Sequence, residues 1–289
     1  MMSNKIKIIE CPRDAMQGIK AFIPTEKKVQ YIQSILRCGF DTIDFGSFVS
    51  PKAIPQMADT AAVLSKLDLS KTQSKLLAIV ANVQGAEMAS KYPEIHYLGY
   101  PFSISENFQM RNTHKTIAES MVILQEIHNI ALKTGKEVVA YLSMGFGNPY
   151  GDPWSVDIVG EWTEKLAAMG IKIISLSDTV GTSTPNVITY LFSHLIPKYP
   201  NVEFGAHLHT VPNLWYEKVD AAFKAGCKRF DGAIQGFGGC PMAKDELTGN
   251  MPTEKLLSYF TAAKCDTNVS WMPFESAHNE ATKVFTVYH

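Results

Sequence analysis

The sequence of 289 residues has few cysteines, no excess of either charge and no long apolar segment. Its five cysteines are odd in number, scattered and free of any CxxC pair, which predicts reduced thiols. Because 27 Lys and Arg oppose 28 Asp and Glu, the net charge is -1 and no basic patch or run is visible. We therefore expect neither nucleic acid nor a membrane surface as a partner, and we expect a small-molecule substrate.

Other absences concern targeting and domain boundaries. No apolar run approaches the roughly 18 residues of a membrane helix, and the first residues contain neither a signal-peptide core nor an Arg-rich amphipathic stretch. These features predict a cytoplasmic protein. No Pro/Ser-rich linker or charge block divides the chain, and 46% of its residues are hydrophobic. The composition is typical of a single globular domain that spans residues 1–289 and buries a large core.

What the chain does contain is an alternation of short apolar, β-branched runs with segments of helical period. Eight runs are expected to form strands, at residues 6–10, 42–48, 76–81, 95–100, 137–144, 171–178, 202–209 and 229–235. Their continuous apolar character suits parallel strands that are buried on both faces. The pattern predicts the α/β class, as a (β/α)8 TIM barrel over residues 5–260 with a C-terminal covering segment at about 262–289.

An open, doubly wound sheet would show the same alternation of strands and helices. The chain has no G-x-G-x-x-G motif after the first run, and polar residues stand at the C-terminal ends of nearly all eight runs. In a barrel, this end of the strands builds the active site. We therefore favour the barrel.

The strongest local motif is His207-Leu208-His209 at the end of the seventh run. A spacing of two puts both imidazoles on one face of a strand, where they can bind one metal ion. An isolated HxH is also typical of two ordinary strand histidines. Arg13 and Asp14 follow the first run; a surface ion pair would explain them, but only one strand separates the first from the seventh in a closed barrel. A carboxylate and two imidazoles suit Mg2+, Mn2+ or a similar divalent ion.

Three glycines in the segment GFGGC, residues 236–240, follow the eighth run and lead to Cys240. They predict a loop that can move with a thiol at its tip, although a flexible turn with an incidental cysteine would look the same. Asn250, shortly afterwards, can supply a neutral oxygen to a metal. Further polar residues at the strand ends are candidates for substrate contacts, although each alone is more typical of a cap or a turn: Gln17, Asp44, Asn82, Ser143, Asp178 and Thr179.

Taken in order, these segments resemble the 3-hydroxy-3-methylglutaryl-CoA lyase family, within the wider group of metal-dependent lyase and condensing-enzyme barrels. The resemblance spans roughly residues 5–259, and its most specific motifs are SFVSPK at 47–52, SDT at 177–179 and GGCP at 238–241. The Arg-Asp pair and the HxH are shared with isopropylmalate, homocitrate and citramalate synthases, so they do not select the reaction.

The resemblance implies a homodimer that uses a divalent cation, Mg2+ or Mn2+, to cleave an acyl-CoA into acetyl-CoA and acetoacetate. It implies four metal ligands: Asp14, His207, His209 and Asn250. It places Arg13, Asp44 and Cys240 close to the substrate. Since proton transfer needs groups that titrate near neutrality, His207 is a candidate base and Cys240 a candidate proton donor, while Arg13 can stabilise the enolate.

Three residues depart from the family pattern. Asp44 stands where the family usually has glutamate, which draws the carboxylate back by about 1.5 Å, Ala15 replaces a glycine and Thr210 replaces an aspartate. A Claisen-type acyltransferase, which would use the same metal and barrel to form a carbon–carbon bond from acetyl-CoA, is the first alternative, followed by an aldolase that acts on a free hydroxy acid. The non-enzymatic alternative is a barrel that has lost catalysis and only binds a metabolite or a partner.

Overall fold

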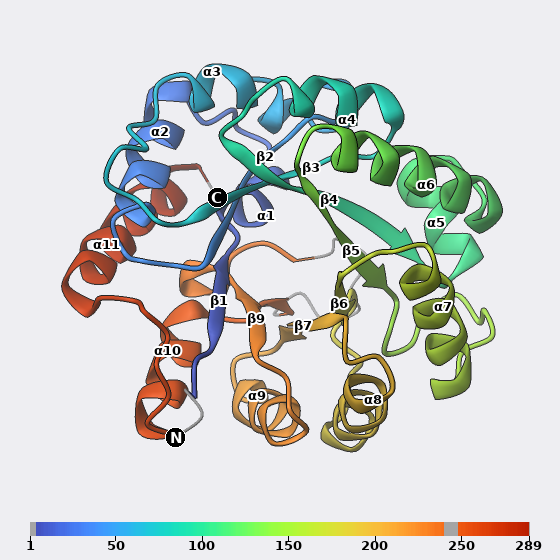
Figure 1. Cartoon of the computed structure of the whole chain (residues 1–289). Coiled ribbons are helices and arrows are strands. Elements are labelled where there is room, and N and C mark those ends of the chain that lie inside the picture. The colour runs from blue at the N-terminus through green and yellow to red at the C-terminus, as the bar shows by residue number, and fades with distance from the viewer. Residues whose placement is uncertain (1–3, 240–247, 289) are drawn as a thin grey trace.

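The computed structural model describes residues 4–239 and 248–288. Eight parallel strands close into a barrel in the order β1-β2-β3-β4-β5-β6-β7-β9, and helices surround it (Figure 1). The strands are β1 Lys7–Glu10, β2 Thr42–Ser47, β3 Lys75–Ile79, β4 Ile95–Ser103, β5 Glu137–Ser143, β6 Ile173–Ser177, β7 Glu203–His207 and β9 Arg229–Gly232. All eight expected strands are present, and the predicted TIM barrel with a single domain is confirmed.

The helices follow the strands in the expected alternation. They are α1 Pro12–Gln17, α2 Thr25–Ile35, α3 Thr60–Leu64, α4 Val83–Ser90, α5 Glu106–Thr113, α6 Ile117–Lys133, α7 Val156–Ala168, α8 Pro185–Lys198, α9 Trp215–Lys224, α10 Thr253–Ala262 and α11 Trp271–Tyr288, with the 3-10 turns η1 Pro55–Met57 and η2 Ile234–Gly236. The side chains of Thr116 and Ser155 cap α6 and α7. Gly135, at φ 69°, adopts the left-handed conformation just beyond the end of α6.

The two faces of each strand pack into different cores. Residues such as Ile174, Ala206 and Phe230 face the surrounding helices and belong to the large outer core. By alternation, Ser175, His207 and the two charged residues of β9 face the barrel axis. A smaller apolar cluster fills the opposite part of the interior, with Leu77, Ile79, Tyr97, Val139, Tyr141 and Ile173. The barrel interior is therefore apolar on one side and polar along β6, β7 and β9.

The seventh strand differs from its expected range of 202–209. β7 ends at His207, and His209 begins a separate two-residue strand, β8 His209–Thr210. β8 pairs antiparallel with β10 Gly249–Asn250, and Asn250 lies directly opposite His209. The chain therefore leaves the barrel wall between the two histidines and brings the segment after the eighth unit against the second one.

The C-terminal segment forms α11, which runs beside α2 at the side of the barrel (Figure 1). Phe285 packs edge-on against Tyr31 of α2 and stacks on Phe237, with ring centroids 4.1 Å apart. Gln235 of η2 donates a hydrogen bond to Thr282 Oγ1. The helix therefore supports the start of the glycine-containing segment. Among the described residues, no helix is both long and apolar enough to cross a bilayer.

Candidate metal centre and active site

Three ligand types meet at the C-terminal end of the barrel. Asp14 on α1, His207 at the end of β7 and His209 in β8 place one potential ligand atom each within 4.8 Å of one another. Asp14 arrives there because α1 begins directly after β1, with Pro12 at its first position. The imidazole centroids lie 5.2 Å apart. The structure thus brings together the two histidines that their spacing paired and the Asp14 that barrel closure was expected to place beside them.

Asn250 lies beside this group. Its amide nitrogen donates to Asp14 Oδ2 at 2.9 Å and to the carbonyl oxygen of Phe237 at 2.8 Å. Both N–H groups are thereby used, so the amide oxygen is the atom that it can offer to a cation. The pairing of β10 with β8 explains how a residue more than 40 positions after His207 reaches the same centre.

The electrostatics of the three residues fit a divalent cation. His209 is buried, and neither ring nitrogen has a hydrogen-bond partner among the described residues. Burial, together with repulsion from His207, lowers the pKa of His209 to about 4, so this imidazole is neutral and its lone pair is available. Burial alone would raise the pKa of Asp14, but attraction to Arg13 and the two histidines outweighs it and lowers that pKa to about 2. An ionised carboxylate beside neutral imidazole is a suitable donor set for Mg2+ or Mn2+.

Arg13 is held rigidly beside this centre. Its Nε donates to Asp44 Oδ2 at 3.0 Å, and its Nη2 reaches the same carboxylate. Its Nη1 donates to Asp14 at 2.8 Å and to Gln17 Oε1 at 2.9 Å, and Gln17 in turn donates to Asp14. Burial raises the pKa of Asp44 to about 6, and the nearby guanidinium only partly offsets this effect. The predicted group of Arg13, Asp14, Gln17 and Asp44 is therefore one connected hydrogen-bond network.

The orientation of His207 depends on a residue that the sequence analysis missed. Asp231 on β9 is buried, and its Oδ2 lies 3.1 Å from His207 Nδ1. Burial would lower the pKa of His207, but the hydrogen bond and the attraction to Asp231 outweigh it and raise this pKa. With Nδ1 facing a carboxylate, Nε2 is the ring atom available as a ligand. A charged residue inside an apolar, buried strand was the available signal for Asp231.

A second set of possible ligands shares His207. Cys11, His207 and Asp231 also place ligand atoms within 4.8 Å of one another. Burial and the surrounding carboxylates raise the pKa of the Cys11 thiol well above its ordinary value, and the thiol points to the carbonyl oxygen of Ile9 at 3.8 Å. Since only a thiolate is a good metal ligand, the set that contains Asp14 is the better candidate.

Residues at and after the C-terminal ends of β5 and β6 lie at the same end of the barrel as the ligand cluster and contact its loops. Asp178 is buried; its oxygens accept hydrogen bonds from Ser183 and, at 2.8 Å, from Lys218 Nζ. The same ammonium donates to the carbonyl oxygen of His209 at 2.8 Å. Thr179 Oγ1 accepts a hydrogen bond from Met144 N, next to the buried Ser143. The contacts of Asp178 and Thr179 thus join neighbouring loops, and nothing local in the sequence of α9 marked Lys218 as the link.

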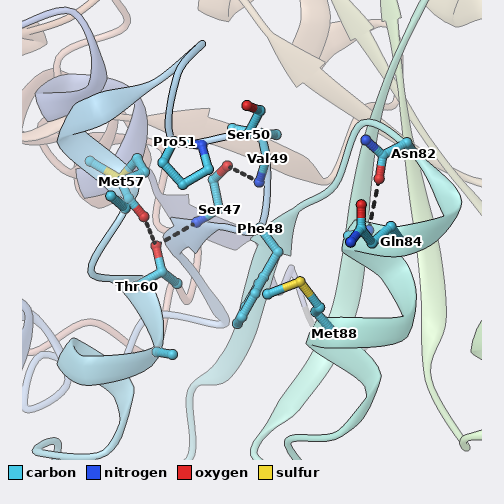
Figure 2. Close-up of a pocket in the computed structure, with 13 residues that line it drawn as sticks. Ser47, Phe48, Val49, Ser50, Pro51, Met57, Thr60, Asn82, Gln84 and Met88 are labelled. Carbon is cyan, nitrogen blue, oxygen red and sulfur yellow. Dashed lines mark hydrogen bonds between the residues drawn. The ribbon is translucent and has the colours of Figure 1, made fainter.

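Asn82 lies farther around the rim, in a cleft of about 280 Å³ at the ends of β2 and β3. Figure 2 shows Asn82 and Gln84 on one side of the cleft and Met57 and Thr60 on the other. The Asn82 side chain caps α4 by accepting a hydrogen bond from Gly85 N. The remaining candidate, Cys240, lies outside the described residues.

Comparison with known proteins identifies the family. The family model described as HMGL-like matches residues 5–280. The hydroxymethylglutaryl-CoA lyase YngG of Bacillus subtilis (strain 168) is 32% identical over 92% of this chain and 88% of its own length. The mitochondrial hydroxymethylglutaryl-CoA lyase of Bos taurus is also 32% identical, over 92% of this chain and 82% of its own length.

Solved structures agree with this similarity. The structure of the Bacillus subtilis HMG-CoA lyase has a TM-score of 0.91 at 31% identity, covering 97% of this chain and 93% of that chain. An HMG-CoA lyase from Acinetobacter baumannii, solved in complex with coenzyme A and 3-methylmalate, has a TM-score of 0.90 at 28% identity, covering 99% of this chain and 93% of that chain. On the extent of these matches, and with the ligand cluster at the expected end of the barrel, this chain belongs to the HMGL-like family.

Proposed function

We propose that this protein is a divalent-metal-dependent carbon–carbon lyase that cleaves 3-hydroxy-3-methylglutaryl-CoA, or a close β-hydroxy acyl-CoA, into acetyl-CoA and acetoacetate. The observation that carries the proposal is the cluster of Asp14, His207 and His209 beside Arg13. The named lyases among its relatives support the choice of reaction, and the relative that was solved with coenzyme A supports an acyl-CoA substrate.

The residues of this chain would have distinct tasks. Asp14, His207, His209 and Asn250 would hold the cation, which lowers the pKa of a bound hydroxyl group and polarises oxygen. His207 was the candidate base, but a ring that ligates through Nε2 and faces Asp231 through Nδ1 has no nitrogen free for a further proton. Asp44, whose pKa burial raises to about 6, would therefore take the proton of the tertiary hydroxyl as the carbon–carbon bond breaks. The electron pair of that bond passes to the departing acetyl thioester as an enolate. Arg13, fixed by Asp44 and Asp14, supplies positive charge next to it.

The enolate must then gain a proton at carbon to give acetyl-CoA. Cys240 is the candidate donor, because it follows the glycine-containing segment that begins beside Asp14. A Cβ added to Gly238 would lie 2.6 Å from the carbonyl oxygen of Asp14, so only glycine allows this close approach. The cleft lined by Asn82 lies at the same rim and offers room for part of the substrate.

The test is release of acetoacetate and acetyl-CoA from 3-hydroxy-3-methylglutaryl-CoA, with Mn2+ or Mg2+ and with a chelator. Release that requires the metal supports the proposal, and Asp14→Asn serves as the matched variant that should abolish it. Absence of release from folded, metal-loaded protein would refute this substrate. Formation of a hydroxy acyl product from acetyl-CoA and a keto acid would instead indicate the condensing reaction.

A further inference from the structure

Below His207, the barrel interior contains a row of polar side chains that the proposed reaction does not use. Strand register aligns Tyr141 with Ser175, Ser175 with Gly205, and Gly205 with Arg229. A Cβ on Gly205 would lie 3.0 Å from Ser175 Oγ and 3.2 Å from Arg229 Cδ. The absence of a side chain at Gly205 therefore lets the arginine lie across the inner face of β7.

Arg229 itself is only 1% exposed, and it uses one edge of its guanidinium group. Nη1 donates to Glu203 Oε1 at 3.3 Å, and Glu203 also pairs with Lys7 at the opposite rim of the barrel from the ligand cluster. Nε and Nη2 have no hydrogen-bond partner among the residues that the structure describes. Burying N–H groups of a guanidinium without a hydrogen-bond partner costs free energy. An acceptor is therefore expected near this edge of Arg229.

Complementary atoms lie in the same part of the interior. Asp231 gives one oxygen to His207, and its other oxygen, Oδ1, has no partner within the described ranges. The same holds for Tyr141 Oη and Ser175 Oγ. Tyr141 packs edge-on against His207 with ring centroids 5.5 Å apart, and Arg229 lies 6.0 Å from the ring of Tyr97 in the same inner cluster. The donors of Arg229 thus lie in the same interior region as a carboxylate oxygen that needs one.

We propose that Arg229 is a positioning residue for the metal centre, acting on His207 through Asp231 by a solvent-bridged contact from its Nε and Nη2 edge to Asp231 Oδ1. An internal water typically makes about three hydrogen bonds, so the same bridge can satisfy Tyr141 or Ser175. The positive charge holds the Asp231 carboxylate in one orientation, which keeps a proton on His207 Nδ1 and leaves Nε2 as the ligand atom. This inference rests on the proposed role of His207 as a metal ligand.

The competing explanation is that Arg229 serves only the ion pair with Glu203. Two variants separate the explanations. Arg229→Met removes the charge and keeps most of the volume, while Glu203→Gln weakens the other partner of Arg229 without touching Asp231. Arg229→Lys restores a charge at the same place and is the rescue variant.

Two readouts are required, and only one of them needs a metal. Mn2+ affinity, measured by titration calorimetry, should fall about tenfold in Arg229→Met, recover in Arg229→Lys and stay within about twofold in Glu203→Gln. In metal-free, 15N-histidine-labelled protein, the ring nitrogen shifts of His207 should show protonated Nδ1 in the wild type and a mixture of tautomers in Arg229→Met. Asp231→Asn provides the reference for a disturbed ring.

Unchanged His207 shifts and unchanged Mn2+ affinity in Arg229→Met would overturn the inference, even if the melting temperature of this variant falls. If the wild type binds no Mn2+, the proposed function fails, and the nitrogen shifts still decide whether Arg229 positions His207. If Arg229→Met does not fold, Arg229→Gln, which keeps an N–H donor but no charge, is judged by the same two outcomes.

Discussion

Removal of the buried Lys218 ammonium should strongly lower the free energy of unfolding. Its ammonium donates to Asp178 at 2.8 Å, to the carbonyl oxygen of His209 at 2.8 Å and to that of Gly181 at 3.2 Å. Lys218→Met keeps the length of the side chain but leaves the buried Asp178 carboxylate with Ser183 as its partner. Removing one member of a buried ion pair costs about 3–5 kcal/mol. At roughly 2–4 °C per kcal/mol, the melting temperature should fall by roughly 10 °C.

The assay is thermal and urea unfolding, both followed by circular dichroism, with Lys224→Met as the matched control. Lys224 lies on the same helix but is exposed, and its ion-pair partner among the described residues is Asp220, so its loss should leave the urea midpoint close to that of the wild type. The double variant Lys218→Met, Asp178→Asn should lose less than the sum of the two single losses, by roughly 1–3 kcal/mol. A loss below about 1 kcal/mol in Lys218→Met, or simple additivity, would refute the buried-pair reasoning.

Three further predictions concern the metal, the loop and pH. Asp14→Asn should abolish turnover and metal binding with the fold intact, as measured by metal analysis and circular dichroism; full metal occupancy would contradict the ligand assignment. Cys240→Ser should lower turnover at least about tenfold with near-normal metal affinity, and unchanged turnover would leave Cys240 without a catalytic role. Burial raises the pKa of Glu10 from its ordinary 4.5 to about 8, so the folded state retains a proton that the unfolded state releases. Wild-type stability should therefore fall relative to Glu10→Gln as the pH rises from 4.5 through 8, and parallel urea midpoints would count against this.

The strands could be predicted because parallel strands buried on both faces leave continuous apolar runs in the sequence. The expected run at 202–209 was too long only because the chain turns between His207 and His209 to form β8. That turn is dictated by pairing with β10, a contact about 40 residues away that no local pattern contains.

The proximity of Asp14 to the two histidines was equally predictable, since closure of the barrel places their strand ends together. Asp231 could have been found, because a charge inside a buried strand needs a partner. Lys218 could not, since an isolated lysine on an amphipathic helix is normally solvated, and only the tertiary structure turns it towards His209.

Asp44, which the family resemblance predicts to lie close to the substrate, carries a shorter side chain than the glutamate usual at this place. The structure shows that Asp44 still reaches both Nε and Nη2 of Arg13 and is completely buried while doing so. The Nη1 edge of the same guanidinium is taken by Asp14 and Gln17. Asp44 therefore forms the ion pair with Arg13 that a glutamate would form, and the number of charges around Arg13 is the same in both cases. Relative to a glutamate, the shorter side chain would hold the Arg13 guanidinium closer to β2, by about the length of one carbon–carbon bond, 1.5 Å. If this protein prefers a different acyl group from its relatives, we expect the cause to be the placement of Arg13 and not its charge.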